Sequence, residues 1–507
     1  MNENSIGLKQ SPSIRTLCAL VLLSFALVTC GGGGGGVATP IPSSTFPASS
    51  TQTNQCAVPR IGTDPYTNQP YPDKQGAVAN EKDWVRSYID ETYLWYKEVP
   101  SLNAASYTTV INYFDVLKTP LTTASGNPKD RFHFIYPTSV WEALSQSGLE
   151  VGYGVQWALI SARPPRKLLV AYTDPGTPAS AASVARGAEV LAIDGVDLVN
   201  GSDVTTINKG FRPATAGEPH TFAILDANST TPRNVTLVSA NVTSVPVQNV
   251  KVIPGTSVGY MQFNDHIATA EGQLITAINQ LKGANITDLV LDVRYNGGGY
   301  LDIASELAYM IAGAASTTGK TFERLAFNDK NPFNTTAADT TVPFHSTSQG
   351  FSVAKGAELP QLGLARVTVI TTAGTCSASE SIINSLRGID VTVNIIGTQT
   401  CGKPYGFFAT PNCGTTYFAI QFQGVNAKGF GDYPDGFVPT CQVGDDYSKQ
   451  LGDSSERMLA AALTYRATGV CPAPSAYGLG PKLESYTNEQ TAFLRSPTRE
   501  MRILTKK

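Results

Sequence analysis

Histidine and charged residues are both scarce in this sequence. The 507 residues include four histidines, and Asp, Glu, Lys and Arg make up 15% of the chain, against about 25% in an average soluble protein. The histidines stand singly, without an HExxH or other ligand spacing, and no Cys-x-x-Cys occurs. We therefore predict no metal site and no cofactor. The net charge of −3 gives no reason to expect a nucleic-acid partner.

The apolar run at the N-terminus, Leu17 to Val28, is too short to span a bilayer as a mature helix. Lys9 and Arg15 precede it, and Cys30 and a run of glycines follow it. This pattern resembles a bacterial lipoprotein signal, although Thr29 stands where a smaller residue is usual. The resemblance implies that Cys30 is lipidated and holds an exported protein at the periplasmic face of the outer membrane, or at the cell surface. The alternative is an ordinary signal peptide with a chance cysteine.

Composition and apolar periodicity change along the chain and predict several segments. Three- and four-residue apolar steps from Trp84 to Tyr96 predict a helix, and strands alternating with helices after residue 246 predict an α/β core with parallel pairing. The predicted segments are a signal peptide (1–29), a flexible linker (30–75), an N-terminal helical domain (76–135), a small β-rich domain (136–245), the α/β core (246–475) and a tail (476–507).

The β-rich segment resembles a PDZ domain. Gly152-Tyr153-Gly154-Val155 opens a strand, and Asp174-Pro175-Gly176-Thr177-Pro178 and Asp194-Gly195 follow in the order of PDZ turns. In a PDZ domain such a glycine loop offers backbone N–H groups to a peptide carboxylate, and the peptide adds a strand to the sheet edge. The same residues also fit a generic small β domain with Asp-Gly turns.

Three glycines follow a predicted buried strand in the run Leu291-Asp292-Val293-Arg294-Tyr295-Asn296-Gly297-Gly298-Gly299. They permit a sharp turn that exposes backbone N–H groups, and the predicted helix that follows favours negative charge at its start. These are the properties of an oxyanion hole. A plain strand–helix turn would show the same pattern.

A second turn carries Ser377 at the start of a predicted helix. Ser377 and Glu380 have the spacing of a capping box, which alone accounts for both residues. Lys403 lies about one helix and one strand further along the chain, in Gly402-Lys403-Pro404. Because the ends of adjacent parallel strands meet at one edge of a sheet, we expect Ser377 and Lys403 to lie together.

These motifs, in this order, resemble the C-terminal processing peptidases of family S41, related to the tricorn protease core. The shared features are a helical N-terminal part, a PDZ domain, an Asp-x-Arg-x-Asn-x-Gly-Gly turn (292–299), a Ser-Ala-Ser-Glu motif (377–380) and a Gly-Lys motif (402–403). The resemblance implies an α/β fold with a ClpP/crotonase-like β-α-β protease core.

The resemblance also implies the roles of the site residues. Ser377 is the nucleophile, Lys403 the general base and Glu380 a supporting residue, while the N–H groups of Gly298 and Ala378 form the oxyanion hole. A lysine is protonated at neutral pH unless burial lowers its pKa, so the base must be buried. Phe407 stands where many family members carry a glutamine that orients the lysine.

Six cysteines remain after Cys18 and Cys30, and 15 pairings are possible. If Ser377 and Lys403 touch, the neighbouring Cys376 and Cys401 are close enough for a disulfide. Reduced, buried cysteines are the alternative. We then expect Cys413–Cys441 around a late strand and Cys56–Cys471 between the linker and the closing helix.

The sequence thus predicts a serine endopeptidase of exported proteins with a polypeptide substrate. One alternative is a non-catalytic binder of peptides or hydrophobic ligands on the same fold. Another is a Ser-His-Asp esterase, which the missing Gly-x-Ser-x-Gly around Ser377 disfavours.

Overall fold

The computed structural model describes residues 46–473 and 502–503. The predicted signal peptide with Cys30 lies outside these residues. Within the described ranges no helix is both long and apolar enough to cross a membrane.

A six-stranded sheet forms the centre of the α/β core, in the order β12-β13-β14-β18-β19-β24. All neighbouring pairs from β13 to β24 are parallel, and β12 runs antiparallel to β13. The predicted α/β core is therefore confirmed. The strands are β12 (Val247–Val252), β13 (Val258–Phe263), β14 (Asp288–Asp292), β18 (Arg366–Thr371), β19 (Thr392–Gly397) and β24 (Cys441–Gln442).

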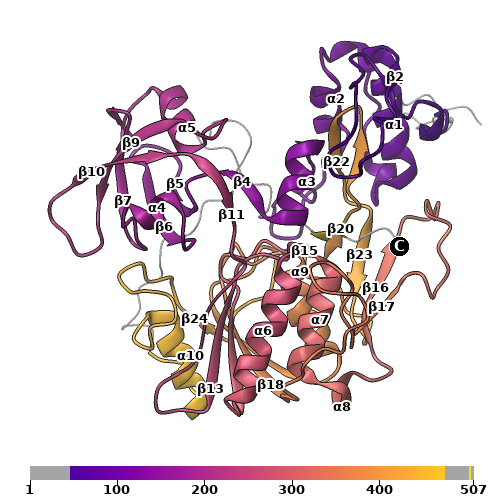
Figure 1. Cartoon of the computed structure of the whole chain (residues 1–507). Coiled ribbons are helices and arrows are strands. Elements are labelled where there is room, and N and C mark those ends of the chain that lie inside the picture. The colour runs from indigo at the N-terminus through magenta and orange to yellow at the C-terminus, as the bar shows by residue number, and fades with distance from the viewer. Residues whose placement is uncertain (1–45, 474–501, 504–507) are drawn as a thin grey trace, which may run out of the picture. The chain divides into compact units, whose positions relative to one another are not determined.

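Both faces of this sheet are covered by helices, which explains why its inner strands are continuously apolar. Alternate residues such as Leu289 and Leu291 pack with α6 (Ala270–Gly283), α7 (Leu301–Ala312) and α9 (Ala378–Gly388). The residue between them, Val290, packs on the other face with α10 (Arg457–Thr468). Figure 1 shows α6, α7 and α9 together on one side of the strands.

The N-terminal region is helical, as the sequence predicts. Its helices are α1 (Val78–Thr92), α2 (Val110–Val116) and α3 (Thr138–Ser147), with short 3₁₀ turns at Ser49–Thr51, Tyr96–Glu98 and Ala104–Ser106. A three-stranded sheet, β21 (Thr410–Asn412), β22 (Thr415–Phe418) and β3 (Phe134–Pro137), joins this region to a hairpin that follows Lys403 in sequence. Trp84 of α1 contacts Tyr417 of that hairpin, with ring centroids 5.1 Å apart.

The β-rich region contains one large sheet, in the order β10-β9-β7-β6-β5, with β8 beside β7. Strand β5 lies at the edge of this sheet. The elements are β4 (Leu149–Gly152), β5 (Val155–Ser161), β6 (Lys167–Thr173), α4 (Pro178–Ala181), β7 (Glu189–Ile193), β8 (Val196–Asp197), α5 (Val204–Phe211), β9 (Pro219–Leu225), β10 (Arg233–Val238) and β11 (Ala240–Thr243), of which β11 pairs with β4.

Smaller sheets complete the core. Strands β16 (Thr321–Phe327), β17 (Thr341–Pro343), β20 (Tyr405–Gly406) and β23 (Phe422–Val425) form one of them, and a short helix, α8 (Ala314–Thr317), precedes it. Strand β15 (Gly299–Tyr300) pairs with β25 (Arg502–Ile503).

Residues 46–75 differ from the expected flexible linker, because they form defined elements. β1 (Gln55–Cys56) pairs with β2 (Lys74–Gln75). Glu91 of α1 accepts hydrogen bonds from the backbone N–H and the hydroxyl of Ser49, at 2.7 and 2.5 Å. The linker composition therefore did not reveal that this segment packs on the helical region.

The structure contains the disulfides Cys56–Cys413, Cys376–Cys401 and Cys441–Cys471. The first and third replace the predicted pairs Cys413–Cys441 and Cys56–Cys471, which are wrong. The β21–β22 hairpin that carries Cys413 pairs with the N-terminal region and so meets Cys56. Cys441 lies on β24 at the sheet edge, where the chain leaving α10 brings Cys471.

Asp174 lies where the β-rich region meets the strand leading into the core. Its Oδ1 accepts hydrogen bonds from Gln248 Nε2 at 2.7 Å and from the Val245 backbone N–H at 3.3 Å. Burial raises the pKa of Asp174 to about 7. The native state therefore keeps a proton that the unfolded chain releases near pH 4, and stability falls as pH rises through this window.

We expect Asp174→Asn, which mimics the protonated form, to remove this pH dependence. At pH 8 the variant should be more stable than the wild type by roughly 2–4 kcal/mol, and near pH 4 the two should match. Urea unfolding at several pH values measures this. Asp115→Asn, at an exposed position, is the control. Parallel stability curves for wild type and Asp174→Asn would contradict the prediction.

Candidate active site

Ser377 has an unusual backbone conformation. It stands between β18 and α9, at the N-cap of that helix, with φ 60° and ψ −117°. Positive φ is uncommon for a residue other than glycine and is typical of strained functional turns, whereas a capping serine has extended backbone. The Ser377 side chain is buried, and its Oγ has no hydrogen-bond partner within residues 46–473. The hydroxyl is therefore not used as a helix cap.

Lys403 is fully buried in the loop that follows β19. Its Nζ lies 4.4 Å from the centroid of the Phe407 ring and 4.7 Å from that of Phe132. Phe407 therefore provides no polar group that could orient the amine. It covers the amine with an aromatic face instead. The second ring comes from the N-terminal region, more than half the chain away in sequence.

The Glu380 carboxylate joins the Ser377 turn to the Lys403 loop. Its Oε2 accepts the backbone N–H of Ser377 at 3.0 Å and that of Lys403 at 2.8 Å. Its Oε1 accepts the backbone N–H of Gly402 at 2.9 Å and the Thr400 hydroxyl at 2.5 Å. Burial raises the pKa of Glu380, and these hydrogen bonds oppose that rise. Because one oxygen binds both backbone nitrogens, the two chain segments lie side by side.

The Cys376–Cys401 disulfide is a second link between the same loops, with a Cα–Cα distance of 5.2 Å. The Cys401 N–H also donates to the Thr375 carbonyl at 3.0 Å. Both sulfurs lie close to the Glu380 carboxylate, within 4.8 Å. Because they are bonded to each other, they are not available as thiolate ligands for a metal at this position.

The glycine turn after β14 packs against the Ser377 turn. The Asn296 carbonyl accepts hydrogen bonds from the Cys376 N–H and the Ser379 hydroxyl, both at 3.1 Å. Gly298 has φ 99°, and its N–H donates to Asn296 Oδ1 at 2.9 Å. The N–H that the sequence analysis assigned to the oxyanion is thus occupied by a side chain here. Ala378 is the first residue of α9, where a helix leaves N–H groups without an intrahelical acceptor.

His266 is a contact of this turn that the sequence analysis missed. Its side chain is fully buried, and its Nδ1 lies 2.9 Å from Asn296 Oδ1. Burial lowers the pKa of His266 to about 3, so the ring is neutral and Nδ1 donates to the amide oxygen. The sequence position of His266 could have predicted this contact. His266 follows shortly after the end of β13, at the sheet edge where β14 and β18 also end.

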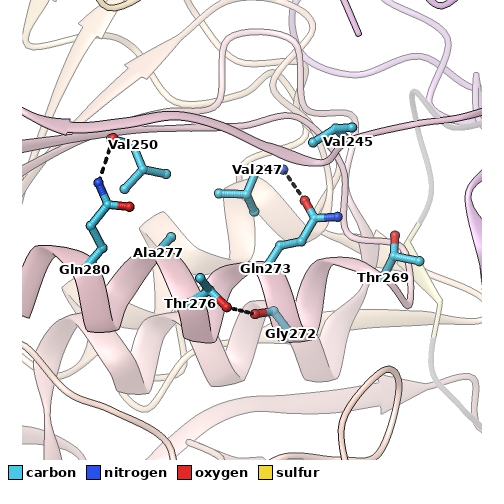
Figure 2. Close-up of a pocket in the computed structure, with 9 residues that line it drawn as sticks. All are labelled: Val245, Val247, Val250, Thr269, Gly272, Gln273, Thr276, Ala277 and Gln280. Carbon is cyan, nitrogen blue, oxygen red and sulfur yellow. Dashed lines mark hydrogen bonds between the residues drawn. The ribbon is translucent and has the colours of Figure 1, made fainter. Parts of the chain in front are cut away.

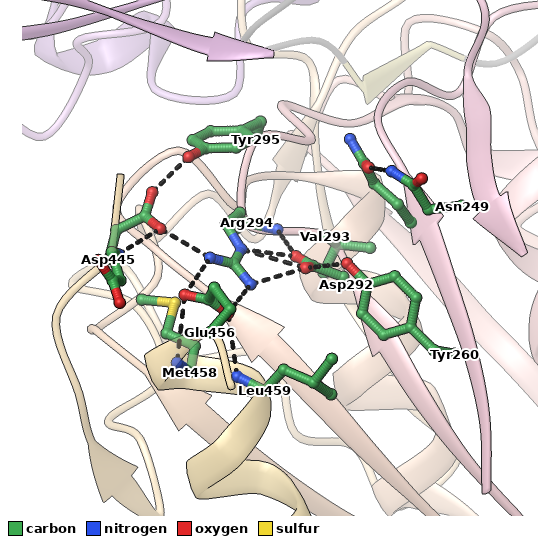
Figure 3. A network of polar contacts seen from close by, with 12 residues as sticks. Asn249, Tyr260, Asp292, Val293, Arg294, Tyr295, Asp445, Glu456, Met458 and Leu459 are labelled. Carbon is green, nitrogen blue, oxygen red and sulfur yellow. Dashed lines mark hydrogen bonds and ion pairs between the residues drawn. The ribbon is translucent and has the colours of Figure 1, made fainter. Parts of the chain in front are cut away.

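A buried ion network lies beneath the same turn (Figure 3). The Arg294 guanidinium binds Asp292 at 2.8 Å, Glu456 at 3.0 Å and Asp445 at 2.7 Å. Asp292 ends β14, and Glu456 caps α10. The network therefore fixes the strand end from which the glycine turn starts.

Arg186 extends this network into the β-rich region. Its guanidinium donates to Tyr295 Oη at 2.6 Å and to Asp445 Oδ1 at 2.7 Å. Although burial alone would raise the pKa of Asp445, Arg186 and Arg294 hold it well below its usual range. The β-rich region thus contacts the glycine-bearing turn through Tyr295.

The predicted peptide-binding turn, Gly152 to Val155, stands where β4 leads into β5. Its Tyr153 is buried, and the phenol donates to the Gly210 carbonyl at 2.8 Å. Gly154 has φ 74°, and a Cβ there would lie 2.3 Å from Thr177. The turn is closely packed beside the edge strand β5.

A shallow depression lies between β12 and α6 (Figure 2). Neither Ser377 nor Lys403 lines it. Its lining residues are Val245, Val247, Val250, Thr269, Gly272, Gln273, Thr276, Ala277 and Gln280.

Comparison with known families agrees with this geometry. Peptidase family S41 matches residues 257–411, which include Ser377, Glu380 and Lys403, and the peptidase S41 N-terminal domain matches residues 80–134, which include Phe132. Residues 257–411 and 80–134 are thus similar to the two domains of peptidase family S41.

Curated relatives resemble this chain at modest identity. A carboxyl-terminal-processing protease of Picosynechococcus sp. is 27% identical over 268 residues, which cover 51% of this chain and 56% of the relative. The chloroplastic carboxyl-terminal-processing peptidase 2 of Arabidopsis thaliana is 26% identical, covering 44% of each chain. The chain spans about half the length of the curated relatives it matches.

The crystal structure of a Bacteroides fragilis protein assigned to the S41 proteases has the same fold. It superposes with a TM-score of 0.59 at 24% identity, covering 79% of this chain and 98% of that one.

We expect Glu380→Gln to lower both stability and any activity of the candidate site. An amide offers one acceptor oxygen where the carboxylate offers two, so buried N–H groups lose their partner, at about 1–3 kcal/mol each. The variant should melt at a lower temperature. Thr400→Val should act in the same direction more weakly, and Thr400→Ser should be neutral.

Thermal unfolding and assays of peptide hydrolysis measure these effects. Glu358→Gln, at an exposed position, is the matched control. If Glu380→Gln melted like the wild type, the carboxylate would not be the link between the two loops.

Proposed function

We propose that this chain is a serine endopeptidase that hydrolyses peptide bonds of exported proteins with Ser377 as nucleophile and Lys403 as general base. The observation that carries the proposal is the strained, buried Ser377 at a helix start, tied by Glu380 to the loop of a fully buried lysine. A nucleophilic hydroxyl needs an adjacent base, and a lysine serves as that base only when its amine is neutral. Lys403 is fully buried, and its amine lies over the faces of Phe407 and Phe132.

In the proposed reaction Ser377 Oγ attacks the scissile carbonyl carbon while Lys403 Nζ accepts the hydroxyl proton. The carbonyl oxygen becomes an oxyanion, stabilised by the N–H of Ala378 at the start of α9. The intermediate collapses to an acyl-enzyme, and the leaving amine takes the proton from Lys403. Water then attacks the acyl group with Lys403 again as base, which releases the carboxylic acid and restores Ser377.

Gly298 is the proposed second donor to the oxyanion. Its N–H binds Asn296 Oδ1 when no substrate is present. Substrate must therefore replace this contact, and Asn296 keeps its other partners, His266 and the Phe263 carbonyl. The neutral His266 holds the amide in place during this exchange.

Glu380 is a positioning residue in this proposal rather than a catalytic one. Its oxygens are bound to backbone N–H groups and to the Thr400 hydroxyl. It orients the loops that carry the nucleophile and the base. This role is compatible with its place in a capping box.

The β-rich region is the proposed site that engages substrate segments, in the manner of a PDZ domain. Its strand β5 lies at a sheet edge, and the turn from Gly152 to Val155 leads into that strand. An edge strand next to a glycine turn suits an extended peptide that adds a strand. Arg186 gives this region a direct contact with the turn of the proposed active site.

We expect Ser377→Ala and Lys403→Ala each to reduce hydrolysis of denatured casein by at least ~10³-fold without loss of fold, because each removes a group that acts in the chemical step. Lys403→Arg should also be inactive, since arginine keeps the charge but cannot act as a base. A chelator should have no effect.

Two variants serve as controls. Ser385→Ala removes a buried serine of the same helix whose Oγ has no partner in the described structure, and Lys428→Ala removes an exposed lysine. Both should remain active. Hydrolysis that persists in Ser377→Ala, with circular dichroism unchanged, would refute the assignment of the nucleophile.

Lipidation at Cys30 is the proposed basis of a membrane anchor. The three disulfides suit an oxidising compartment. We expect Cys30→Ala to move the protein from the membrane to the soluble fraction, because an unmodified chain has no lipid. Cys18→Ala should remain in the membrane fraction. Immunoblots of fractionated cells test this, and soluble wild-type protein would refute the anchor.

A further inference from the structure

The segment Arg502–Ile503 pairs with the chain of the proposed active site. It forms β25, which runs parallel to β15, with Arg502 opposite Gly299 and Ile503 opposite Tyr300. The same segment also contacts β20, Tyr405–Gly406. Labels β15 and β20 mark neighbouring positions at one end of the α/β core in Figure 1.

Both neighbours of this segment adjoin proposed site residues. Strand β15 begins at Gly299, the residue after Gly298 of the glycine turn. Strand β20 begins two residues after Lys403. The segment Arg502–Ile503 therefore lies between the chain that carries an oxyanion donor and the chain that carries the base.

The backbone of β15 is oriented to accept a strand at this position. The Gly298 carbonyl and the Tyr300 N–H are bound to the backbone of His266, at 3.2 and 2.8 Å. Since successive peptide groups of an extended chain point to opposite sides, the N–H and carbonyl of Gly299 point away from His266. They face the side on which Arg502 pairs.

Gly299 also keeps this edge in place. It has φ 138°, and a Cβ at this position would lie 2.5 Å from the His266 carbonyl oxygen. Only glycine allows the turn to approach His266 so closely while it presents its peptide group to a further strand.

We propose that the segment containing Arg502 and Ile503 is an intramolecular pseudosubstrate, which binds β15 as an added strand and competes with polypeptide substrate for the site. Competition with a polypeptide substrate rests on the proposed function, whereas the addition of a strand rests on the observed pairing of β25 with β15. An extended peptide bound by backbone hydrogen bonds to a strand edge is a general mode of peptide recognition. Because the segment belongs to the same chain, it competes at an effective concentration that does not depend on protein concentration.

The first experiment uses the full chain with Ile503→Pro. Proline removes a backbone N–H and disrupts strand pairing. We expect the KM for denatured casein to fall at least ~3-fold with kcat unchanged, which is the result of removing a competitor. Ala492→Pro, upstream in the same terminal region, should leave both constants at wild-type values. An unchanged KM in Ile503→Pro would overturn the proposal.

The second experiment needs no catalysis and separates this inference from the proposed function. A fluorescent peptide with the sequence of residues 498–507 is titrated into Ser377→Ala and into Ser377→Ala/Ile503→Pro. We expect the double variant to bind the peptide more tightly, since its own segment no longer fills the site, and a peptide with proline at the position of Ile503 to bind neither. Equal binding by the two proteins would overturn the inference even if Ser377 proves to be the nucleophile. Tighter binding by the double variant would support it even if no hydrolysis is found.

Discussion

The arrangement of the site depends on one buried carboxylate. Glu380 receives three backbone N–H groups and a hydroxyl from two loops that follow different strands of the central sheet. Taking a carboxylate out of water is costly unless its oxygens are fully hydrogen-bonded. In the observed arrangement the two loops together supply hydrogen-bond donors to both oxygens. The disulfide between Cys376 and Cys401 links the same two loops covalently. The disulfide thus keeps the loops close together, and the hydrogen bonds to Glu380 orient them.

The core, and the position of the candidate site motifs at its strand ends, could be predicted because their signals are local. Apolar strands such as Leu289-Val290-Leu291 alternate with amphipathic helices, and Ser377, Glu380 and Lys403 lie in short motifs at strand ends. The capping-box spacing of Ser377 and Glu380 was ambiguous in the sequence. A capping box consists of two reciprocal hydrogen bonds, and the structure contains one of them. The Glu380 carboxylate accepts the Ser377 N–H, whereas the Ser377 hydroxyl has no hydrogen-bond partner in the described structure.

Long-range contacts could not be predicted in the same way. Nothing near Cys413 in the sequence shows that its hairpin pairs with β3 and so meets Cys56. His266 looked like any isolated histidine, because its contact with Asn296 arises from the parallel pairing of β13 and β14. The ordered chain at residues 46–75 had the composition of a linker, and its internal β1–β2 pairing, its contact with α1 and its disulfide to Cys413 became apparent only in the structure.

Phe132 places an aromatic ring of the N-terminal region next to the Lys403 amine of the core. One aromatic face over the Lys403 amine belongs to that region, and the guanidinium of the adjacent Arg131 donates to the Cys401 carbonyl. The same region is attached by β3 and by the Cys56–Cys413 disulfide to the hairpin that follows Lys403. The surroundings of the amine are therefore completed only when segments from distant parts of the chain have assembled and the disulfide has formed. A half-folded chain therefore contains Ser377 and Lys403 but lacks the two aromatic faces that enclose the Lys403 amine in the assembled structure.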